Sequence, residues 1–198
     1  MVIVMTIDQR GSQRGRDLID ELIRDLAELL PAAALVRPFE RTAGDETQGL
    51  LASSHYAVTA ALKLVRDGSW SVGLGVGPVR GPIPASVRAA TGPAFVHARE
   101  AVVRAKSSPR HLAVSGPNPR TSGDAEALLA LLAAIVQRRS RHGWEVADLM
   151  ATGMTQQEAA IRLGISPQAV SQRLHAALWH EQQRAEPLAA RLLDAADS

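Results

Sequence analysis

Two kinds of segment alternate along the first 116 residues of the chain. In one kind the apolar residues are consecutive, and in the other they recur at helical spacing. The runs have the length and β-branched content of strands, and they cover residues 2–7, 35–41, 47–52, 70–79 and 111–115. Between them, helical spacing covers residues 16–30, 55–66 and 92–106. The order strand, helix, strand, strand, helix, strand, helix, strand predicts an α+β sandwich of the ferredoxin-like kind, with helices on one face of an antiparallel sheet.

Polar residues and glycines near the ends of these strands are candidates for function. Asp8 stands at the C-terminal tip of the first strand, and residues 9–15 form a polar turn. Gly44 and Asp45 form a tight turn between the second and third strands, which is a hairpin signal. The strand at 70–79 alternates apolar residues with glycines, which favours close packing against another backbone or a ligand.

The sequence PNPRTSG at residues 117–123 is typical of a linker. After it, an Ala- and Leu-rich helix runs from its cap, Asp124, to about Arg139. Its apolar stripe either packs against the chain's own domains or forms a dimer helix that joins the two halves. The predicted organisation is an α+β domain at residues 1–122, a connecting helix at 123–140 and an all-α domain at 141–198.

Residues 144–150 form the first helix of the second half, and residues 155–175 then have the pattern of two short helices joined by a turn. Thr155 caps the first of these two helices, and Gly164 ends it where a left-handed backbone is needed. Ser166 caps the second, whose first position is a proline with no amide hydrogen to lose.

The second of these helices is apolar on one face only. Val170 and Leu174 face inward at helical spacing. The outward residues are Gln168, Ala169, Ser171, Gln172, Arg173 and His175. Small polar groups and a guanidinium suit base edges and phosphates. The helix is predicted to continue through residues 176–183, and Pro187 to start a terminal helix that packs back or dimerises.

This stretch resembles the helix-turn-helix of bacterial regulators, with a small Ala160, Gly164 four residues later and Val170 six beyond it. The resemblance implies DNA contacts at Thr155, Ser166, Gln168, Ala169, Ser171, Gln172 and Arg173. The alternative is a helical hairpin in an ordinary bundle. That alternative predicts large apolar residues on both faces of the second helix, whereas the sequence has them on one.

Composition narrows the class of protein. The chain has 198 residues, a formal net charge of +2 and no cysteine, which excludes disulfides and thiolate metal sites. No apolar run approaches the roughly 20 residues of a membrane span, and the first residues lack a basic leader, so we expect a cytoplasmic protein. Because acidic and basic residues are mixed around residues 155–175, we expect useful DNA affinity to require a homodimer.

Four motifs occur in the first half in the order TID, AGDE, GLGVGPVRG and GPAFVHAREAV. This order resembles the catalytic domain of class III nucleotide cyclases and, more closely, the SatD family, over residues 1–116. The resemblance implies a cyclase-like fold in which Asp8 and Asp45 hold Mg²⁺ beside a nucleotide. It also implies that Arg41 stands at the base-selecting position and that Glu46 extends the ligand site.

The third predicted helix departs from the cyclase pattern. That pattern places an asparagine and then an arginine there, whereas this chain has Val96 and Glu100, and only a shifted register supplies Arg99. Transition-state donors contribute on the order of 10²-fold each in rate. We therefore expect a degenerate domain without enzyme activity, which binds a nucleotide-type ligand or scaffolds a dimer.

Together these patterns predict a homodimeric bacterial transcription regulator that binds double-stranded DNA. A nucleotide with Mg²⁺ at Asp8 and Asp45 would change the spacing of two recognition helices, which must lie about one DNA turn apart. Two alternatives stay open. One is a divergent class III nucleotide cyclase with an accessory helical domain, and the other is an adaptor whose helix-turn-helix contacts a protein.

Overall fold

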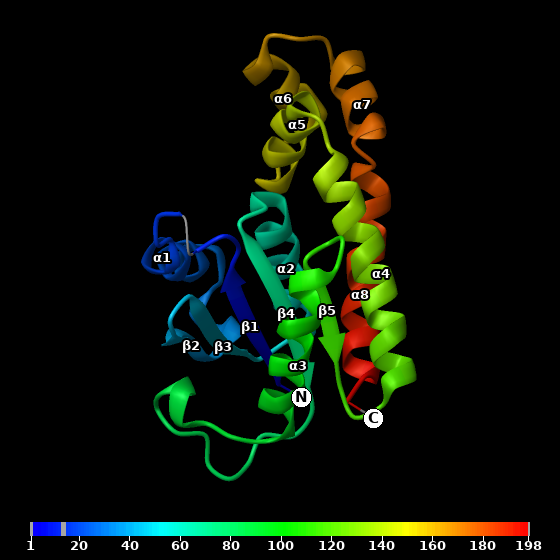
Figure 1. Ribbon diagram of the computed structural model, residues 1–198. Helices are drawn as coiled ribbons and strands as arrows, with labels where there is room; N and C mark the ends of the chain where they lie inside the picture. Colours follow the sequence, from blue (N-terminus) through cyan, green and yellow to red (C-terminus); the bar gives the residue numbers. More distant parts are fainter. Residues whose placement is uncertain (1, 13–14, 198) are drawn as a thin grey trace.

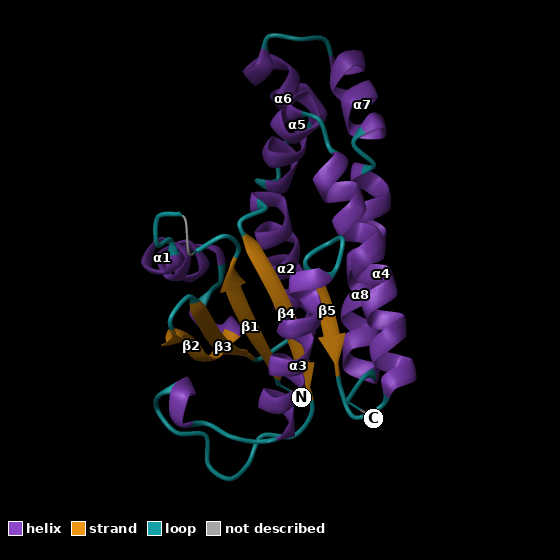
Figure 2. Cartoon of the chain, in the orientation of Figure 1, coloured by secondary structure: helices purple, strands orange, loops and turns teal. Residues whose placement is uncertain are grey.

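The chain folds into a sheet at one end and a set of helices that extends away from it (Figure 1). The computed structural model describes residues 2–12 and 15–197. The strands are β1 (Ile3–Gln9), β2 (Leu35–Ala43), β3 (Glu46–Leu51), β4 (Trp70–Val76) and β5 (Leu112–Ser115). Across these described residues they form one five-stranded sheet in the order β2-β3-β1-β4-β5 (Figure 2). The α+β class is therefore confirmed.

The prediction of a fully antiparallel sheet is wrong for one pair of neighbouring strands. β1 pairs antiparallel with β3 and β4, and β2 with β3, but β4 and β5 run parallel. The chain leaves β4, passes through helix α3 (Pro93–Ser107) and returns in the same direction, which is the connection that a parallel pair requires.

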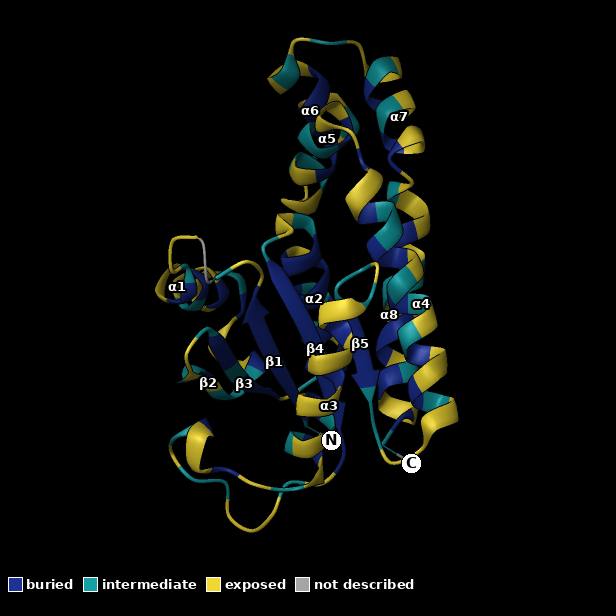
Figure 3. Ribbon diagram, viewed as in Figure 1, coloured by how far each residue is buried: buried dark blue, intermediate teal, exposed yellow. Residues whose placement is uncertain are grey.

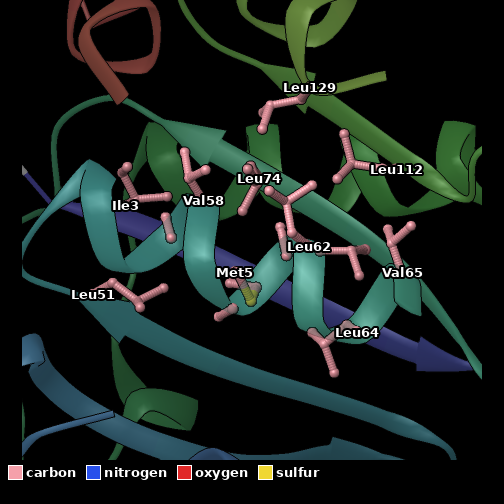
Figure 4. Close-up of a cluster of buried hydrophobic side chains, with 14 of the residues drawn as sticks. Ile3, Met5, Leu51, Val58, Leu62, Leu64, Val65, Leu74, Leu112 and Leu129 are labelled. Carbon is pink, nitrogen blue, oxygen red and sulfur yellow. The ribbon is translucent and has the colours of Figure 1, made fainter. Parts of the chain in front are cut away.

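Helices cover both faces of this sheet, so the prediction of helices on one face is also wrong. Helices α1 (Ile19–Leu29) and α2 (Ser54–Asp67) pack on the face of the main apolar core. Figure 4 shows part of that core, with Met5, Val58 and Leu74 among its side chains. Helix α3 packs on the opposite face against Val4 and Leu50.

Two glycines of β4 make room for α3. A Cβ added at Gly75 would lie 2.2 Å from the backbone oxygen of Ala94 and 2.2 Å from the backbone nitrogen of Ala98. A Cβ at Gly73 would lie 2.3 Å from the backbone nitrogen of Val102. The sequence left open whether these glycines face a backbone or a ligand, and the structure identifies the backbone of α3.

The hairpin forms as predicted, because β2 ends at Ala43 and β3 starts at Glu46. Gly44 takes a φ of 57°, which is costly for other residues. Asp8 lies at the C-terminal end of β1, as predicted, where it is opposite Glu46 of β3. Residues 13 and 14 of the predicted turn lie outside the described residues.

The predicted linker is wrong, because helix α4 (Pro119–Arg138) begins inside it. Asn118 caps this helix by accepting hydrogen bonds from the backbone nitrogens of Arg120 and Thr121 at 3.0 and 3.4 Å. The pair Asn118-Pro119 therefore supplies the cap that was predicted at Asp124.

Three short helices lie at the end of the molecule far from the sheet (Figure 1). They are α5 (Arg141–Ala151), α6 (Gln156–Leu163) and α7 (Pro167–Ala176), and we call them the three-helix unit. They enclose a small core of Val146, Ala159, Ala160, Val170 and Leu174. The rest of the chain, from β1 to α4 together with the last helix, is called the sheet unit.

The last helix, α8 (Trp179–Ala195), corrects two predictions. The second short helix does not continue to residue 183, because Leu178 takes a φ of 50° and the guanidinium of Arg139 binds the carbonyl oxygen of Ala177 at 3.0 Å. Pro187 lies inside α8 instead of starting a helix. The packing of α8 outweighs the helix-interior cost of proline, which is about 3 kcal/mol.

Of the two roles predicted for the terminal segment, packing back is the one observed. Ala189, Leu193 and Ala196 are buried in the main core, and Ser54 of α2 donates a hydrogen bond to Asp194. Figure 3 shows the buried stripe where α8 and α4 lie along one another. Within residues 2–12 and 15–197, no helix is long and apolar enough to cross a membrane.

Candidate functional site

The start of α6 is fixed by a reciprocal pair of hydrogen bonds between Thr155 and Glu158. The Thr155 hydroxyl accepts from the backbone nitrogen of Glu158 at 3.3 Å, and the Glu158 carboxylate accepts from the Thr155 backbone nitrogen at 2.7 Å. This capping box satisfies amides that the helix itself leaves free. The backbone and side-chain hydrogen bonds from Thr155 lower the pKa of Glu158. Thr155 therefore has the structural role predicted for it.

Replacing Thr155 with alanine is expected to destabilise the three-helix unit by about 1 kcal/mol, because the change removes a helix cap. Chemical denaturation followed by circular dichroism measures this loss. Thr152→Ala is the control, since its hydroxyl donates to the carbonyl oxygen of Leu149 at 2.7 Å and caps no helix N-terminus. Equal stability of the two variants would contradict the capping role.

The turn between α6 and α7 also follows local chemistry. Gly164 has φ 65° and ψ 34°, and the Ile165 backbone nitrogen donates to the Ala160 carbonyl oxygen at 3.1 Å. Ser166 then caps α7 by accepting from the Ala169 backbone nitrogen at 3.2 Å. These bonds hold α7 at a fixed angle to α6, with its first turn open to solvent.

The outer face of α7 is polar and exposed. Gln168, Ser171, Gln172 and His175 are exposed, whereas Ala169 is half-buried. Arg173 differs from the prediction of a fully outward residue: it is half-buried, and its Nη1 lies 3.3 Å from a carboxylate oxygen of Glu145 on α5. In Figure 3, the ribbon of α7 at the far end of the molecule has exposed, intermediate and buried segments.

The sheet unit brings two of its four predicted ligand residues together. Asp8 and Asp45 line one cavity of about 570 Å³, with Lys106 and His111 also in its wall. Lys106 places its Nζ 2.5 Å from a carboxylate oxygen of Asp8, whose side chain is only 9% exposed. Asp45 accepts a hydrogen bond from the Ser12 hydroxyl.

The other two predicted ligand residues face elsewhere. Glu46 forms an ion pair with Arg99 of α3 and accepts from the Thr42 hydroxyl at 3.0 Å. Arg41 binds Asp17 at 2.7 Å, next to α1. The hydrogen bond from Arg41 lowers the pKa of Asp17.

The residues at Asp8 and Asp45 do not fit a Mg²⁺ ion as they stand. A Mg²⁺ ion at Asp8 would lie beside the ammonium of Lys106, whose Nζ is 2.5 Å from one of the two carboxylate oxygens, and two cations in that place repel each other. Among residues 2–12 and 15–197, no group of three or more His, Asp or Glu side chains is placed to hold a metal ion. The negative charge that a metal would neutralise is compensated by Lys106 and, at the adjacent Glu46, by Arg99.

Sequence reasoning missed this pair of cations. Arg99 and Lys106 lie seven residues apart, so they share one face of α3 and reach two neighbouring strands. Helical spacing alone contained that signal. The cyclase pattern instead places a functional side chain at position 96, where this chain has Val96, which is 58% exposed on α3.

Replacing Lys106 with methionine is expected to lower stability by about 1 kcal/mol, because it leaves the buried Asp8 carboxylate without its counter-ion. The double variant Asp8→Asn with Lys106→Met is expected to recover most of that loss, since both charges are then gone. Thermal unfolding of the four proteins of this cycle measures the coupling. Additive losses would show that the two groups do not interact.

The chain thus has two separate candidate sites, which are the outer face of α7 and the cavity beside Asp8. Comparisons of the sequence and the structure with family models, with curated proteins and with solved structures found no match.

Proposed function

We propose that this protein is a DNA-binding transcription regulator that reads DNA with α7. The observation that carries the proposal is the combination of the capped α6–α7 pair with a second helix that buries only Val170 and Leu174. In a helix-turn-helix, the second helix lies in the major groove, and its N-terminal residues meet base edges. α7 is free to do this because it lies at the end of the molecule away from the sheet (Figure 1).

The exposed side chains of α7 suit this role chemically. The amides of Gln168 and Gln172 each carry a donor and an acceptor, which matches the edge of adenine in the major groove. Ser166 and Thr155 lie at helix N-termini, where backbone amides and hydroxyls bind phosphates. Arg173 reaches a phosphate once it leaves Glu145.

A single copy of α7 offers few cations, so the proposal includes a homodimer that binds a palindrome. The formal net charge of the chain is +2, and counterion release by phosphate contacts provides much of the affinity for DNA. Two copies double these contacts and fix the half-site spacing at about one DNA turn.

The sheet unit serves in this proposal as a SatD-like, cyclase-like domain that binds a nucleotide-type ligand or scaffolds the dimer. The strand order β2-β3-β1-β4 is that of a ferredoxin-like sheet, to which β5 adds an edge strand. The exposed Val96 and the contact of Lys106 with Asp8 support the proposal that this domain does not catalyse a fast reaction. We place the protein in the bacterial cytoplasm.

The second candidate is a divergent nucleotide cyclase, favoured by the shared cavity of Asp8 and Asp45, and it requires Lys106 to leave Asp8 so that a metal ion can bind there. Its volume of about 570 Å³ is in the usual range for small-ligand sites. The assay incubates the full chain with ATP or GTP and Mg²⁺ or Mn²⁺. Cyclic product that disappears in Asp45→Asn would establish the cyclase and remove the degenerate-domain proposal.

Anisotropy titration of a labelled random-sequence duplex pool tests DNA binding at several salt concentrations. The regulator is expected to bind at low salt, with affinity that falls steeply as salt rises. An adaptor would show no DNA binding at low salt and would instead hold a protein partner through high salt.

Glu145→Gln is expected to tighten DNA binding roughly threefold to tenfold, because it removes a carboxylate that binds Arg173 at 3.3 Å and Arg141 at 3.4 Å. The same titration measures this gain. Glu28→Gln on α1 is the matched control and is expected to leave affinity unchanged. Weaker binding by Glu145→Gln would mean that Glu145 positions Arg173 instead of competing for it.

A further inference from the structure

A cleft of about 260 Å³ lies where the three-helix unit meets the sheet unit. Its walls come from α2, α5, α8, the end of α4 and Leu29 at the end of α1. The apolar part of the wall includes Leu62, Val136 and the indole rings of Trp144 and Trp179. Residues of both units therefore line one cleft.

Arg139 is a buried cation in this wall. Only 8% of the residue is exposed, and its guanidinium stacks over Trp144 at 4.3 Å. Its Nε and Nη2 donate to the Ala177 carbonyl oxygen at 3.2 and 3.0 Å, and Nη2 also donates to Gln182. These partners are uncharged, and no carboxylate of the described residues lies within 4.0 Å of the guanidinium.

The remaining nitrogen of this guanidinium lacks a partner. Nη1 of Arg139 is buried, and no hydrogen-bond acceptor is in reach among residues 2–12 and 15–197. Burial, and next the charge of Arg66, lower the pKa of Arg139, and the more distant carboxylates of Asp148 and Glu186 only partly offset this. A buried charge without an opposite charge is costly, so this position is suited to an anion.

The acidic groups beside the cleft are already engaged. Asp148 accepts two hydrogen bonds from Arg66, at 2.5 and 2.7 Å. Glu186 accepts one from Gln182 at 2.6 Å. Lys63 is exposed in the same wall and has no ion pair within the described part of the chain.

We propose that this cleft binds a small aromatic acid. Its carboxylate pairs with the exposed Lys63 and offsets the charge of the buried Arg139 behind the wall, and its ring packs against Trp179, Val136 and Leu62. Such a ligand contacts both units and stabilises their relative placement, which sets the direction of α7. The binding itself does not depend on the proposed function, but its effect on DNA rests on that function.

Calorimetric titration of the full chain with indole-3-acetate, phenylacetate and the amide of each tests the proposal. At least one acid is expected to bind saturably and at least tenfold more tightly than its amide, because only the acid supplies the missing charge. Lys63→Met removes a cation from the wall, and Gln183→Glu adds a carboxylate to it. Because both changes make the wall less attractive to an anion, each is expected to weaken acid binding about tenfold. Gln157→Glu, on α6 outside the cleft, is the matched control and is expected to have no effect.

Three results would overturn the proposal: no saturable binding of either acid, equal affinity for acid and amide, or unchanged acid binding in both wall variants. A DNA titration with and without the acid separates this proposal from the proposed function. Acid binding without any DNA binding would contradict the regulator and leave the cleft proposal intact.

Discussion

Replacing Gly75 with alanine is expected to destabilise the protein by at least about 3 kcal/mol, a large part of the roughly 5–15 kcal/mol typical of folded domains. The added Cβ would lie 2.2 Å from backbone atoms of Ala94 and Ala98. Backbone atoms inside a helix cannot rotate away as a side chain can, so α3 must separate from β4. That separation opens the apolar cluster of Val4, Leu50, Ala94 and Ala98.

Urea denaturation of Gly75→Ala measures the loss, and Gly123→Ala provides a matched control. Gly123 lies in α4 with no atom within 4 Å of an added Cβ, so alanine there is expected to raise stability by about 0.5–1 kcal/mol. The two glycine-to-alanine changes thus have opposite expected signs. A Gly75→Ala protein within 1 kcal/mol of the wild type would contradict the observed packing of α3.

The double variant Gln172→Ala with Arg173→Ala is expected to lose specific DNA binding by at least about 100-fold. A bidentate base contact contributes about 1–3 kcal/mol of discrimination, and an arginine–phosphate contact adds salt-dependent affinity. Neither side chain belongs to the core of the three-helix unit, so the fold is expected to remain. Among residues 2–12 and 15–197, the side-chain interaction that this variant loses is the contact of Arg173 with Glu145, which is partly exposed.

Anisotropy titration on a selected operator measures this loss, with circular dichroism as the check on folding. The control combines Gln137→Ala on α4 with Arg24→Ala on α1, which removes the same two residue types from exposed positions elsewhere. If the double variant is folded and binds the operator as tightly as the wild type, α7 is not the helix that reads the DNA sequence.

Features determined by neighbouring residues in the chain were predictable from the sequence. The turn at Gly44-Asp45 and the caps at Thr155 and Ser166 are confirmed because each depends on a few consecutive residues. The order of strands and helices over residues 1–116 is confirmed for the same reason, since each of these elements has a strong apolar period.

Features set by distant residues were not predictable. α7 ends at Ala176 because Arg139, 38 residues before Ala177 in sequence, binds the Ala177 carbonyl oxygen. Helix α3 covers the second face of the sheet because the glycines of β4 leave room for its backbone. A single sequence does not determine on which face of a sheet a crossover helix packs.

The candidate ligand site also combines features that the sequence predicts with features that depend on distant residues. Asp8 and Asp45 line one cavity because both lie at the same end of paired strands. Arg41 and Glu46 are drawn away by Asp17 and Arg99, which belong to segments far from the hairpin in sequence. Ion-pair partners of this kind depend on tertiary packing.

The most direct test of the central claim is selection of bound genomic DNA fragments by the purified full chain, in parallel with the Gln172→Ala, Arg173→Ala variant. The wild type is expected to enrich one palindromic site, with half-sites about one DNA turn apart, and the variant is expected to enrich none. No enrichment by the wild type, or the same site enriched by both proteins, would contradict DNA reading by α7.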